Sequence, residues 1–282
     1  MTLGEALSAA QAALAAVTDT PRLDAEWLLE HVTALDRPQL LIRADDALDE
    51  ASSARYFALV ERRRRGEPLA YLTGERGFWS LNLKVSADVL VPRPETELLV
   101  EWSLLLIAEL DRPVIADLGT GSGALALALA TERPDAIVDA TDVSAAALVI
   151  AQGNAERLGL QRVRFQRGHW LEPLADQAYD LLVSNPPYIA ANDAHLQALQ
   201  YEPMLALSDG ADGLGALREI ISSAPAHLRR NGWLMVEHGY DQGAAVRDLF
   251  ARTGFSAIET RRDLGGQERA TAGCWSSGAV SA

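Results

Sequence analysis

The residues with the clearest chemical potential are Asn185-Pro186-Pro187-Tyr188. They follow Tyr179–Val183, an apolar run that predicts a short buried strand. Two successive prolines cannot continue a strand, because each lacks an N–H and has a fixed φ. The sequence therefore predicts a rigid loop that holds Asn185 at the carboxyl end of a strand, the edge at which open α/β sheets bind ligands.

Such a loop suits methyl transfer to a planar nitrogen. The lone pair of an amide or exocyclic amine is delocalised, so the nitrogen needs acceptors that hold its N–H groups and direct it at the methyl donor. The Asn185 side-chain oxygen and the Pro186 carbonyl can act as these acceptors. Tyr188 offers an aromatic face to a flat amide or base. A proline-rich turn capped by Asn185 explains an isolated motif of this kind equally well.

A second candidate site is the loop Asp117-Leu118-Gly119-Thr120-Gly121-Ser122-Gly123. It lies between an apolar strand, 113–117, and a helix predicted to begin at Ala124. Glycine at every second position lets a ligand approach the backbone where a Cβ would collide. Asp142 ends the next strand, nineteen residues after Gly123, close to the spacing of ribose-binding acids in nucleotide-binding βαβ units.

Two features favour S-adenosylmethionine over NAD as the ligand of this loop. The glycine spacing G-x-G-x-G is tighter than the dinucleotide pattern G-x-G-x-x-G. Asp117 would attract the ammonium group of a methionine moiety, whereas it would repel a pyrophosphate. Trp170, which follows a third strand near Val163–Phe165, is either a residue that flanks the adenine or a core residue. His169 is either a base or, as is more usual for a lone histidine there, a surface or structural residue.

Composition narrows the class of protein. The chain has 282 residues, of which 49% are hydrophobic, enough for one large domain or two smaller ones. A net charge of −14 argues against a broad phosphate-binding surface. The single cysteine, Cys274, excludes an intramolecular disulfide and a cysteine-based zinc cluster, so we expect no metal. No apolar run reaches the roughly 18 residues of a membrane span, and no signal pattern precedes the first helix, which predicts a cytoplasmic protein.

Residues 1–75 are predicted to form a helical bundle. Apolar residues recur at helical spacing in four segments: Leu3–Val17; a helix from Pro21, with Thr20 as N-cap and Trp27 on its apolar face; a short helix near Pro38 that holds Leu40 and Leu41; and Asp49–Arg65. The last ends in the only dense basic run, Arg62–Arg65. A solvated helix end is the preferred interpretation of this run, and a docking patch for an acidic or RNA-bound partner is the alternative.

Residues 76–93 are predicted to form a β-hairpin linker, from the alternating runs Gly77–Val85 and Val89–Val91. A helix over Leu98–Leu110 is expected next. Residues 113–275 then alternate strands and helices, which predicts a parallel sheet covered on both faces. Glu237 ends one of these strands, Trp233–Glu237. A solvated charge is the preferred interpretation of Glu237, and a role in the site is the alternative.

The sequence resembles the bacterial peptide chain release factor glutamine methyltransferase family over nearly its whole length. The resemblance rests on the segments Pro68-Leu69-Ala70-Tyr71-Leu72-Thr73-Gly74, Phe78-Trp79, Pro92-Arg93-Pro94-Glu95-Thr96-Glu97, Asp117–Gly123, Asn185–Tyr188 and Asp209-Gly210-Ala211-Asp212-Gly213-Leu214. The combination of Arg-Pro-Glu-Thr-Glu with Asn-Pro-Pro-Tyr is highly specific, whereas either motif alone is not.

The resemblance implies a helical substrate-docking domain (1–75), a hairpin linker (76–93) and a class I methyltransferase domain (94–282) whose last strand is antiparallel. It implies S-adenosylmethionine as donor and, as substrate, the glutamine of the Gly-Gly-Gln loop of class 1 release factors, methylated on its side-chain nitrogen by a monomeric enzyme that binds no nucleic acid. The implied donor-binding residues are Asp117, Gly119, Thr120, Gly121, Ser122, Gly123, Asp142, Trp170 and Asn185. The implied substrate-binding residues are Asn185, Pro186, Pro187 and Tyr188, with Asn185, Pro186 and Tyr188 catalytic.

One position departs from the family pattern. Where relatives often have an acid before the tryptophan, this chain has His169, which puts a side-chain contact to adenine there in doubt. Three alternatives stay open at this point. They are a related enzyme that methylates a glutamine of a large-subunit ribosomal protein, a DNA or RNA adenine-amine methyltransferase, and a non-catalytic donor-binding module.

Overall fold

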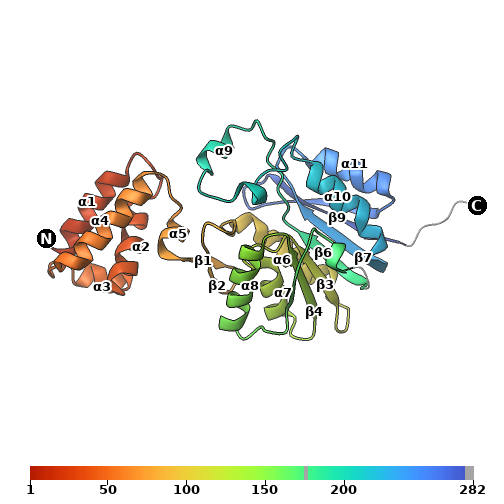
Figure 1. The fold of residues 1–282 in the computed structure, drawn as a ribbon, viewed down its shortest axis with the longest axis horizontal. Coiled ribbons are helices and arrows are strands. Elements are labelled where there is room, and N and C mark those ends of the chain that lie inside the picture. The colour runs from red at the N-terminus through yellow and green to blue at the C-terminus, as the bar shows by residue number, and fades with distance from the viewer. Residues whose placement is uncertain (175–176, 277–282) are drawn as a thin grey trace, which may run out of the picture. The chain divides into compact units, whose positions relative to one another are not determined.

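The computed structural model describes residues 1–174 and 177–276, and the chain divides into two compact units, Met1–Glu75 and Arg76–Ala282. Figure 1 shows a helical first unit and a second unit built on a twisted sheet. Each unit has a hydrophobic core of its own.

The first unit is a small helical bundle. Its helices are α1 (Leu3–Leu14), α2 (Pro21–Thr33), α3 (Arg37–Ile42), α4 (Glu50–Arg64) and α5 (Leu69–Thr73). Short helices such as these are stable only when packed together, and the largest side chain at the centre is Tyr56, whose hydroxyl donates to the Ala25 carbonyl at 3.0 Å. The predicted bundle is therefore present.

Two local details of this unit differ from a simple expectation. Trp27 was expected on the apolar face of α2 but is 43% exposed, because α2 buries the face formed by Ala25, Leu28 and Leu29. Thr20 occupies the N-cap position and Pro21 the first helical position, as predicted, but the Thr20 hydroxyl makes no capping hydrogen bond and instead donates to the Asp24 carboxylate at 3.0 Å.

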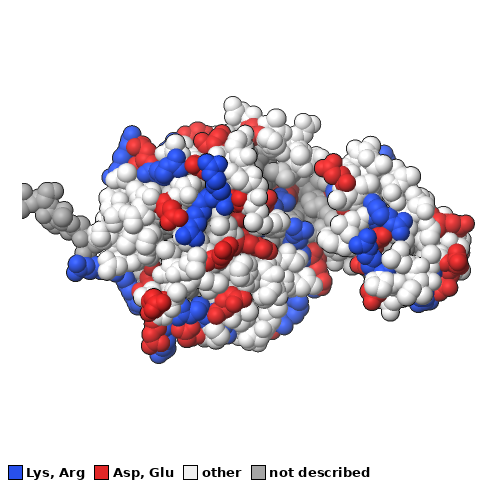
Figure 2. Space-filling view, turned by 180° about the vertical axis from the view of Figure 1, so that it is seen from behind, with Lys and Arg blue, Asp and Glu red and all other residues white. Residues whose placement is uncertain are grey.

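The basic run Arg62–Arg65 at the end of α4 is neutralised locally. Its ion-pair partners are Glu67 for Arg62, Asp24 for Arg63, and Glu61 for Arg64 and Arg65. On the face of the molecule shown in Figure 2, basic and acidic side chains are likewise interspersed. These pairings agree with a helix end whose charges are locally satisfied, the preferred interpretation of the sequence.

A two-stranded hairpin, β1 (Glu75–Phe78) and β2 (Leu81–Lys84), follows the first unit. The hairpin turns at Trp79, which has a φ of +53°. The segment Val89–Val91, expected to contribute a strand, is instead irregular, and its valines are buried. The apolar alternation there reflects burial of a loop rather than strand pairing.

The second unit is a seven-stranded sheet in the order β5-β4-β3-β6-β7-β9-β8. The strands are β3 (Val114–Leu118), β4 (Ile137–Asp142), β5 (Arg164–Arg167), β6 (Tyr179–Ser184), β7 (Leu228–Glu237), β8 (Ser256–Arg262) and β9 (Glu268–Trp275). The first five pair in parallel, while β9 is antiparallel to β7 and β8. The predicted α/β methyltransferase sheet with an antiparallel last strand is confirmed.

Helices cover both faces of this sheet (Figure 1). They are α6 (Glu97–Leu106), α7 (Ala124–Glu132), α8 (Ala145–Arg157), α10 (Gly215–Ser223) and α11 (Gly243–Thr253). The short helix α9 (His195–Ala198) lies in a loop away from the sheet (Figure 1) and buries no residue. The unit also has 3₁₀ turns at Pro94–Thr96, Glu172–Leu174, Met204–Ala206 and Ala224–Ala226. Successive residues of β3 enter different cores, Ile115 one and Ala116 the other, as strand geometry requires. Helix α6 ends at Leu106, four residues earlier than expected.

This arrangement places the carboxyl ends of β3, β4, β6 and β7 at one edge of the sheet, where ligands bind in open α/β folds. Within the described ranges 1–174 and 177–276, no helix has the length and apolar character needed to cross a membrane.

Candidate active site

A cavity of about 590 Å³ opens at this edge, entirely within the second unit. Its lining includes most of the predicted site residues: Asp117, Gly119, Thr120, Gly121, Ser122, Asp142, Trp170, Asn185 and Pro187. Gly123, Pro186 and Tyr188 do not line it. Thr96 and Arg93, from the Arg-Pro-Glu-Thr-Glu segment, do. The structure thus brings the glycine-rich loop and the Asn-Pro-Pro-Tyr loop to one cavity.

Asp117 is the penultimate residue of β3, just before the glycine-rich loop, and only 1% of its surface is exposed. Its Oδ2 accepts hydrogen bonds from the Thr120 hydroxyl (2.6 Å) and the Ala126 N–H (3.2 Å), whereas its Oδ1 is buried with no partner. Burial raises the pKa of Asp117 to about 7, the two hydrogen bonds lower it, and the charge of Asp142 raises it further. An unpaired buried carboxylate oxygen at the cavity is a suitable partner for a cationic ligand group.

Asp142, at the end of β4, holds the glycine-rich loop in place. Its Oδ2 accepts from the Gly121 N–H at 2.9 Å and its Oδ1 from the Ser144 N–H at 2.8 Å. Burial raises the pKa of this carboxyl, and these backbone donors oppose the rise. Each carboxylate oxygen has further lone pairs, so Asp142 can still accept hydrogen bonds from a pair of ribose hydroxyls.

Gly119 and Trp170 pack directly together. Gly119 has a φ of +75°, and a Cβ there would lie 2.9 Å from Cζ3 of Trp170. Glycine is therefore required both for the backbone conformation and for the contact. Trp170 lines the cavity and also packs against the core, so both roles considered for it are present.

His169 pairs with a carboxylate from another element. Its Nδ1 lies 3.0 Å from Oε1 of Glu219 on α10, and both residues line the cavity. The acid absent at position 169 is therefore replaced nearby by one from α10, in a pair that is about half exposed.

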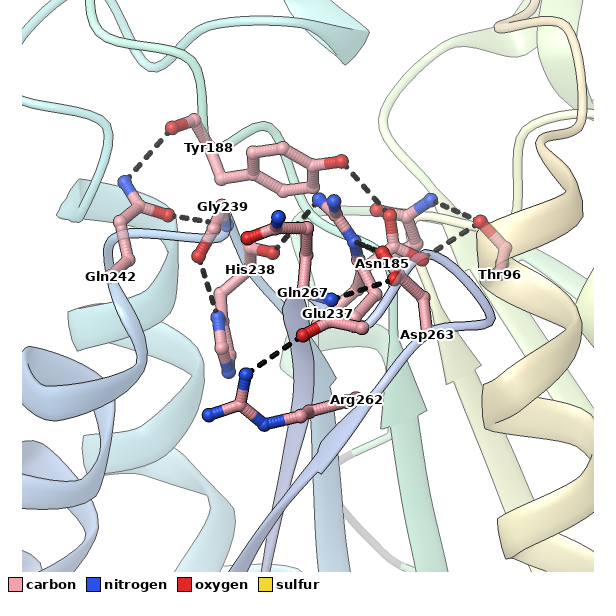
Figure 3. Close-up of polar contacts among 12 residues, drawn as sticks. Thr96, Asn185, Tyr188, Glu237, His238, Gly239, Gln242, Arg262, Asp263 and Gln267 are labelled. Atoms are coloured by element: carbon pink, nitrogen blue, oxygen red, sulfur yellow. Dashed lines mark hydrogen bonds and ion pairs between the residues drawn. The ribbon is translucent and has the colours of Figure 1, made fainter.

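Asn185 is oriented by a chain of hydrogen bonds (Figure 3). Its Nδ2 donates to Oγ1 of Thr96 at 3.1 Å, and Thr96 donates to Oε2 of Glu237 at 2.7 Å. Tyr188 donates from its hydroxyl to Oε1 of the same carboxylate at 2.9 Å. Glu237 is 1% exposed, so its interpretation as a solvated charge is wrong. Burial raises the pKa of Glu237 to about 7.

The backbone around Tyr188 is clamped from the opposite side. Gln242 Nε2 donates to the carbonyls of Tyr188 (3.0 Å) and Gly213 (3.2 Å). A Cβ on Gly213, where φ is +77°, would lie 2.3 Å from the Tyr188 carbonyl oxygen. The loop that carries Gly213 is itself held by Asp209, which accepts from the backbone N–H groups of Ala211, Gly213 and Gly215. The Asp-Gly-Ala-Asp-Gly-Leu motif thus positions the Asn-Pro-Pro-Tyr loop.

The Arg-Pro-Glu-Thr-Glu segment is anchored in the same way. Buried Glu202 accepts from the Val91 N–H at 3.0 Å and from the guanidinium of Arg93. Sequence reasoning missed Thr96, Glu202 and Gln242 as contributors to the site. The only sequence signal for Thr96 was its place in a motif whose acids were explained as helix caps.

Comparisons with known proteins identify the family. The profile of the PrmC N-terminal domain matches residues 5–74, and that of the methyltransferase small domain matches residues 96–206. A release factor glutamine methyltransferase of Xylella fastidiosa is 52% identical over 265 residues, which cover 93% of this chain and 96% of the relative. One from Coxiella burnetii is 48% identical over 256 residues, 91% of this chain and 92% of the relative.

The chain belongs to the release factor glutamine methyltransferases. The family resemblance of the sequence is thereby confirmed. Solved structures agree on the fold: a methyltransferase of Pyrococcus furiosus covers 81% of this chain and 100% of its own at 16% identity (TM-score 0.52). The catalytic domain of hMettl16, in complex with a MAT2A 3′UTR hairpin, covers 81% of both chains at 16% identity (TM-score 0.57).

Membership of the release factor glutamine methyltransferases makes this chain an enzyme with S-adenosylmethionine as its methyl donor, as predicted in preference to NAD. The alternative of a non-catalytic module is therefore discarded. The cavity residues fit this donor: the unpaired Oδ1 of Asp117 suits its ammonium group, and Asp142 suits its ribose hydroxyls.

Proposed function

We propose that this enzyme methylates the side-chain nitrogen of the glutamine in the Gly-Gly-Gln sequence of class 1 release factors. One observation carries the proposal. The Nδ2 of Asn185 is engaged by Thr96, so the Oδ1 of Asn185 is the end of the amide available to an incoming N–H at the cavity that the donor residues also line. The names of the relatives indicate a release factor as the protein substrate.

In this mechanism S-adenosylmethionine, when bound, supplies an electrophilic methyl group. Asp117, Asp142 and the glycine-rich loop hold the donor, and Trp170 lies along the adenine. Asn185 Oδ1 and the Pro186 carbonyl accept the two N–H groups of the substrate amide and direct its nitrogen at the methyl group. Transfer would exchange the methyl group's bond to sulfur for a bond to the amide nitrogen and leave the neutral thioether S-adenosylhomocysteine. The nitrogen, still held by the Asn185 oxygen and the Pro186 carbonyl, would then release one of its two protons to water. Pro187 lines the cavity wall against which the glutamine lies, and Tyr188, which does not line the cavity, supports the loop through its hydrogen bond to Glu237.

Mass spectrometry of a purified release factor, incubated with the enzyme and S-adenosylmethionine, tests the proposal. We expect one added methyl group on the Gly-Gly-Gln glutamine. Asn185→Ala should reduce turnover by about 10²-fold or more while donor affinity changes less, because misplacing the attacking group is costly. A methyl group found instead on a ribosomal protein or on nucleic acid would refute the assigned substrate, and an Asn185→Ala variant with normal turnover would refute the acceptor role.

We further propose that residues 1–75 dock the release factor away from its glutamine, that residues 76–93 link this domain to the catalytic domain (94–282), and that the enzyme acts as a cytoplasmic monomer. The first unit has a core of its own, which suits a separate binding module. A fragment that begins at residue 76 should therefore bind the release factor more weakly than the full chain. Equal affinity of the two proteins would contradict the docking role, and sedimentation of the full chain would test the monomer.

A further inference from the structure

Glu237 is a buried carboxylate to which the proposed reaction gives no role. It lies at the end of β7 and receives two hydroxyl donors, Thr96 at 2.7 Å and Tyr188 at 2.9 Å (Figure 3). The three side chains come from separate segments, a 3₁₀ turn, a loop after β6 and β7. A carboxylate with no proton accepts only, so both hydroxyls must donate to it.

This requirement fixes the direction of the next hydrogen bond. The Thr96 hydroxyl has a single hydrogen, which Glu237 receives, so its oxygen can only accept from Asn185. The NH₂ end of the Asn185 amide must therefore face Thr96, and its oxygen must face away from Thr96. If Thr96 instead donated to Asn185, the amide would turn over and present N–H groups to the N–H groups of the substrate.

We propose that Glu237 and Thr96 are positioning residues that set the polarity of the Asn185 amide, so that its oxygen meets the substrate nitrogen. The same carboxylate fixes Tyr188, and one buried charge therefore orients both ends of the Asn-Pro-Pro-Tyr motif. The inference rests on the proposed function, because it assumes that Asn185 accepts from the substrate amide.

The charges around Glu237 make the orientation of the Asn185 amide sensitive to pH. Arg269 on β9 faces Glu237 and Tyr188 and favours the ionised carboxylate, whereas Glu95 in the neighbouring 3₁₀ turn opposes it. Arg269 is itself held by Asp263, at 3.1 Å. Burial outweighs the favourable contacts and raises the pKa of Glu237 to about 7. Below that pH the Glu237 carboxyl carries a proton that it can donate. The direction of the hydrogen bonds from Asn185 through Thr96 to Glu237 is then no longer imposed.

Three threonine variants test the inference on the full-length enzyme, with release factor as substrate. Thr96→Val removes the hydroxyl but keeps the shape, and it should lower kcat about tenfold or more with donor affinity, measured by calorimetry, within about twofold of the wild type. Thr96→Ser keeps the hydroxyl and should retain most of the activity. The control is Thr253→Val on α11, whose hydroxyl donates only within its own helix, to Leu249 at 2.9 Å.

A pH profile supplies a second, independent measurement. The donor is kept saturating at every pH, so that protonation of Asp117 does not limit the rate. In the wild type, kcat should then fall as the pH decreases through about 7, and Glu237→Gln should have a low kcat that lacks this limb because an amide does not titrate. Normal kcat in Thr96→Val, or Thr96→Ser as slow as Thr96→Val, would overturn the inference. If Thr96→Val does not fold, the profile of Glu237→Gln decides, and an unchanged acid limb refutes the role of Glu237. A wild-type enzyme that leaves release factor unmethylated would instead refute the proposed function.

Discussion

Donor binding to this enzyme should weaken steeply as the pH falls, because the contact that we propose between Asp117 and the donor's ammonium group requires Asp117 to be ionised. The perturbation to compare with the wild type is Asp117→Asn, which keeps an oxygen for the Thr120 hydroxyl but cannot carry a charge. The expectation follows from the unpaired Oδ1 of Asp117 and from the burial that raises the pKa of this carboxyl to about 7 in the free enzyme.

The magnitude follows from the ionised fraction of Asp117. With a pKa of about 7, that fraction is about 76% at pH 7.5 and about 1% at pH 5. If only the ionised form binds, affinity should fall about 80-fold between these two pH values. At pH 7 about half of the free enzyme has a protonated Asp117, so binding should release about half a proton.

Calorimetric titration with S-adenosylhomocysteine measures both quantities, since this demethylated product retains the ammonium group and cannot react. Affinities measured at pH 5 and pH 7.5 give the change of donor affinity with pH. Binding heats measured in buffers of different ionisation enthalpy give the number of protons released. Asp117→Asn should lose most of the pH dependence. Asp142→Asn serves as the comparison, because burial also raises the pKa of Asp142, whose two oxygens both accept backbone N–H groups. Equal pH dependence in the wild type and Asp117→Asn would refute the reasoning.

Three further predictions concern the loop, the hairpin and stability. Gly119→Ala should weaken donor binding, measured by calorimetry, about tenfold or more, because the new Cβ would lie 2.9 Å from Trp170. The matched control is Gly159→Ala, since Gly159 has a similar φ of +71° and a Cβ there would meet no atom within 4 Å. This variant should bind the donor normally. Asn154→Ala should lower the free energy of unfolding in urea by about 2–4 kcal/mol, because Asn154 is fully buried and forms hydrogen bonds with the backbone of Lys84 and Ser122. The control Asn192→Ala, at an exposed position, should change this free energy little. The pKa of Asp117 is higher in the folded state than in the unfolded state. The contribution of Asp117 to stability is therefore full below about pH 4 and is lost as the pH rises through about 7. The free energy of unfolding of the wild type relative to that of Asp117→Asn should decrease over that range, and a difference that does not change with pH would contradict the prediction.

Much of the fold followed from local patterns in the sequence. The short apolar runs that precede Asp117, Asp142 and Asn185 are strands because such runs are too short for helices. Glycine or proline follows closely after the first and the last of them. Their order in the sheet then places all three residues at one edge. Val89–Val91 was mistaken for a strand because period-two burial in a loop has the same pattern as a strand that is paired.

The least predictable part of the site was the set of hydrogen bonds that hold Asn185 and Tyr188 in place. Glu237 read as a solvated charge, since an acid at a strand end usually reaches water and nothing nearby in the sequence could pair with it. Its partners, Thr96 and Tyr188, are 141 and 49 residues away. Pairings at such separations depend on how the strands assemble, and no local pattern encodes them. The predicted burial of Trp27 was wrong for a related reason. An apolar helix can bury any of several faces, and the sequence does not show which face its neighbours cover.

The long separation between Thr96 and Glu237 also bears on how the enzyme is made. A nascent chain emerges from the ribosome in sequence order, so the glycine-rich loop and the Asn-Pro-Pro-Tyr loop are synthesised well before the strand that carries Glu237 and before Arg269, which faces it from β9. A nascent chain that ends before residue 237 lacks the carboxylate that holds Asn185 and Tyr188. The support of Asn185 and Tyr188 is therefore acquired only after β7 has been synthesised, later than both loops of the cavity.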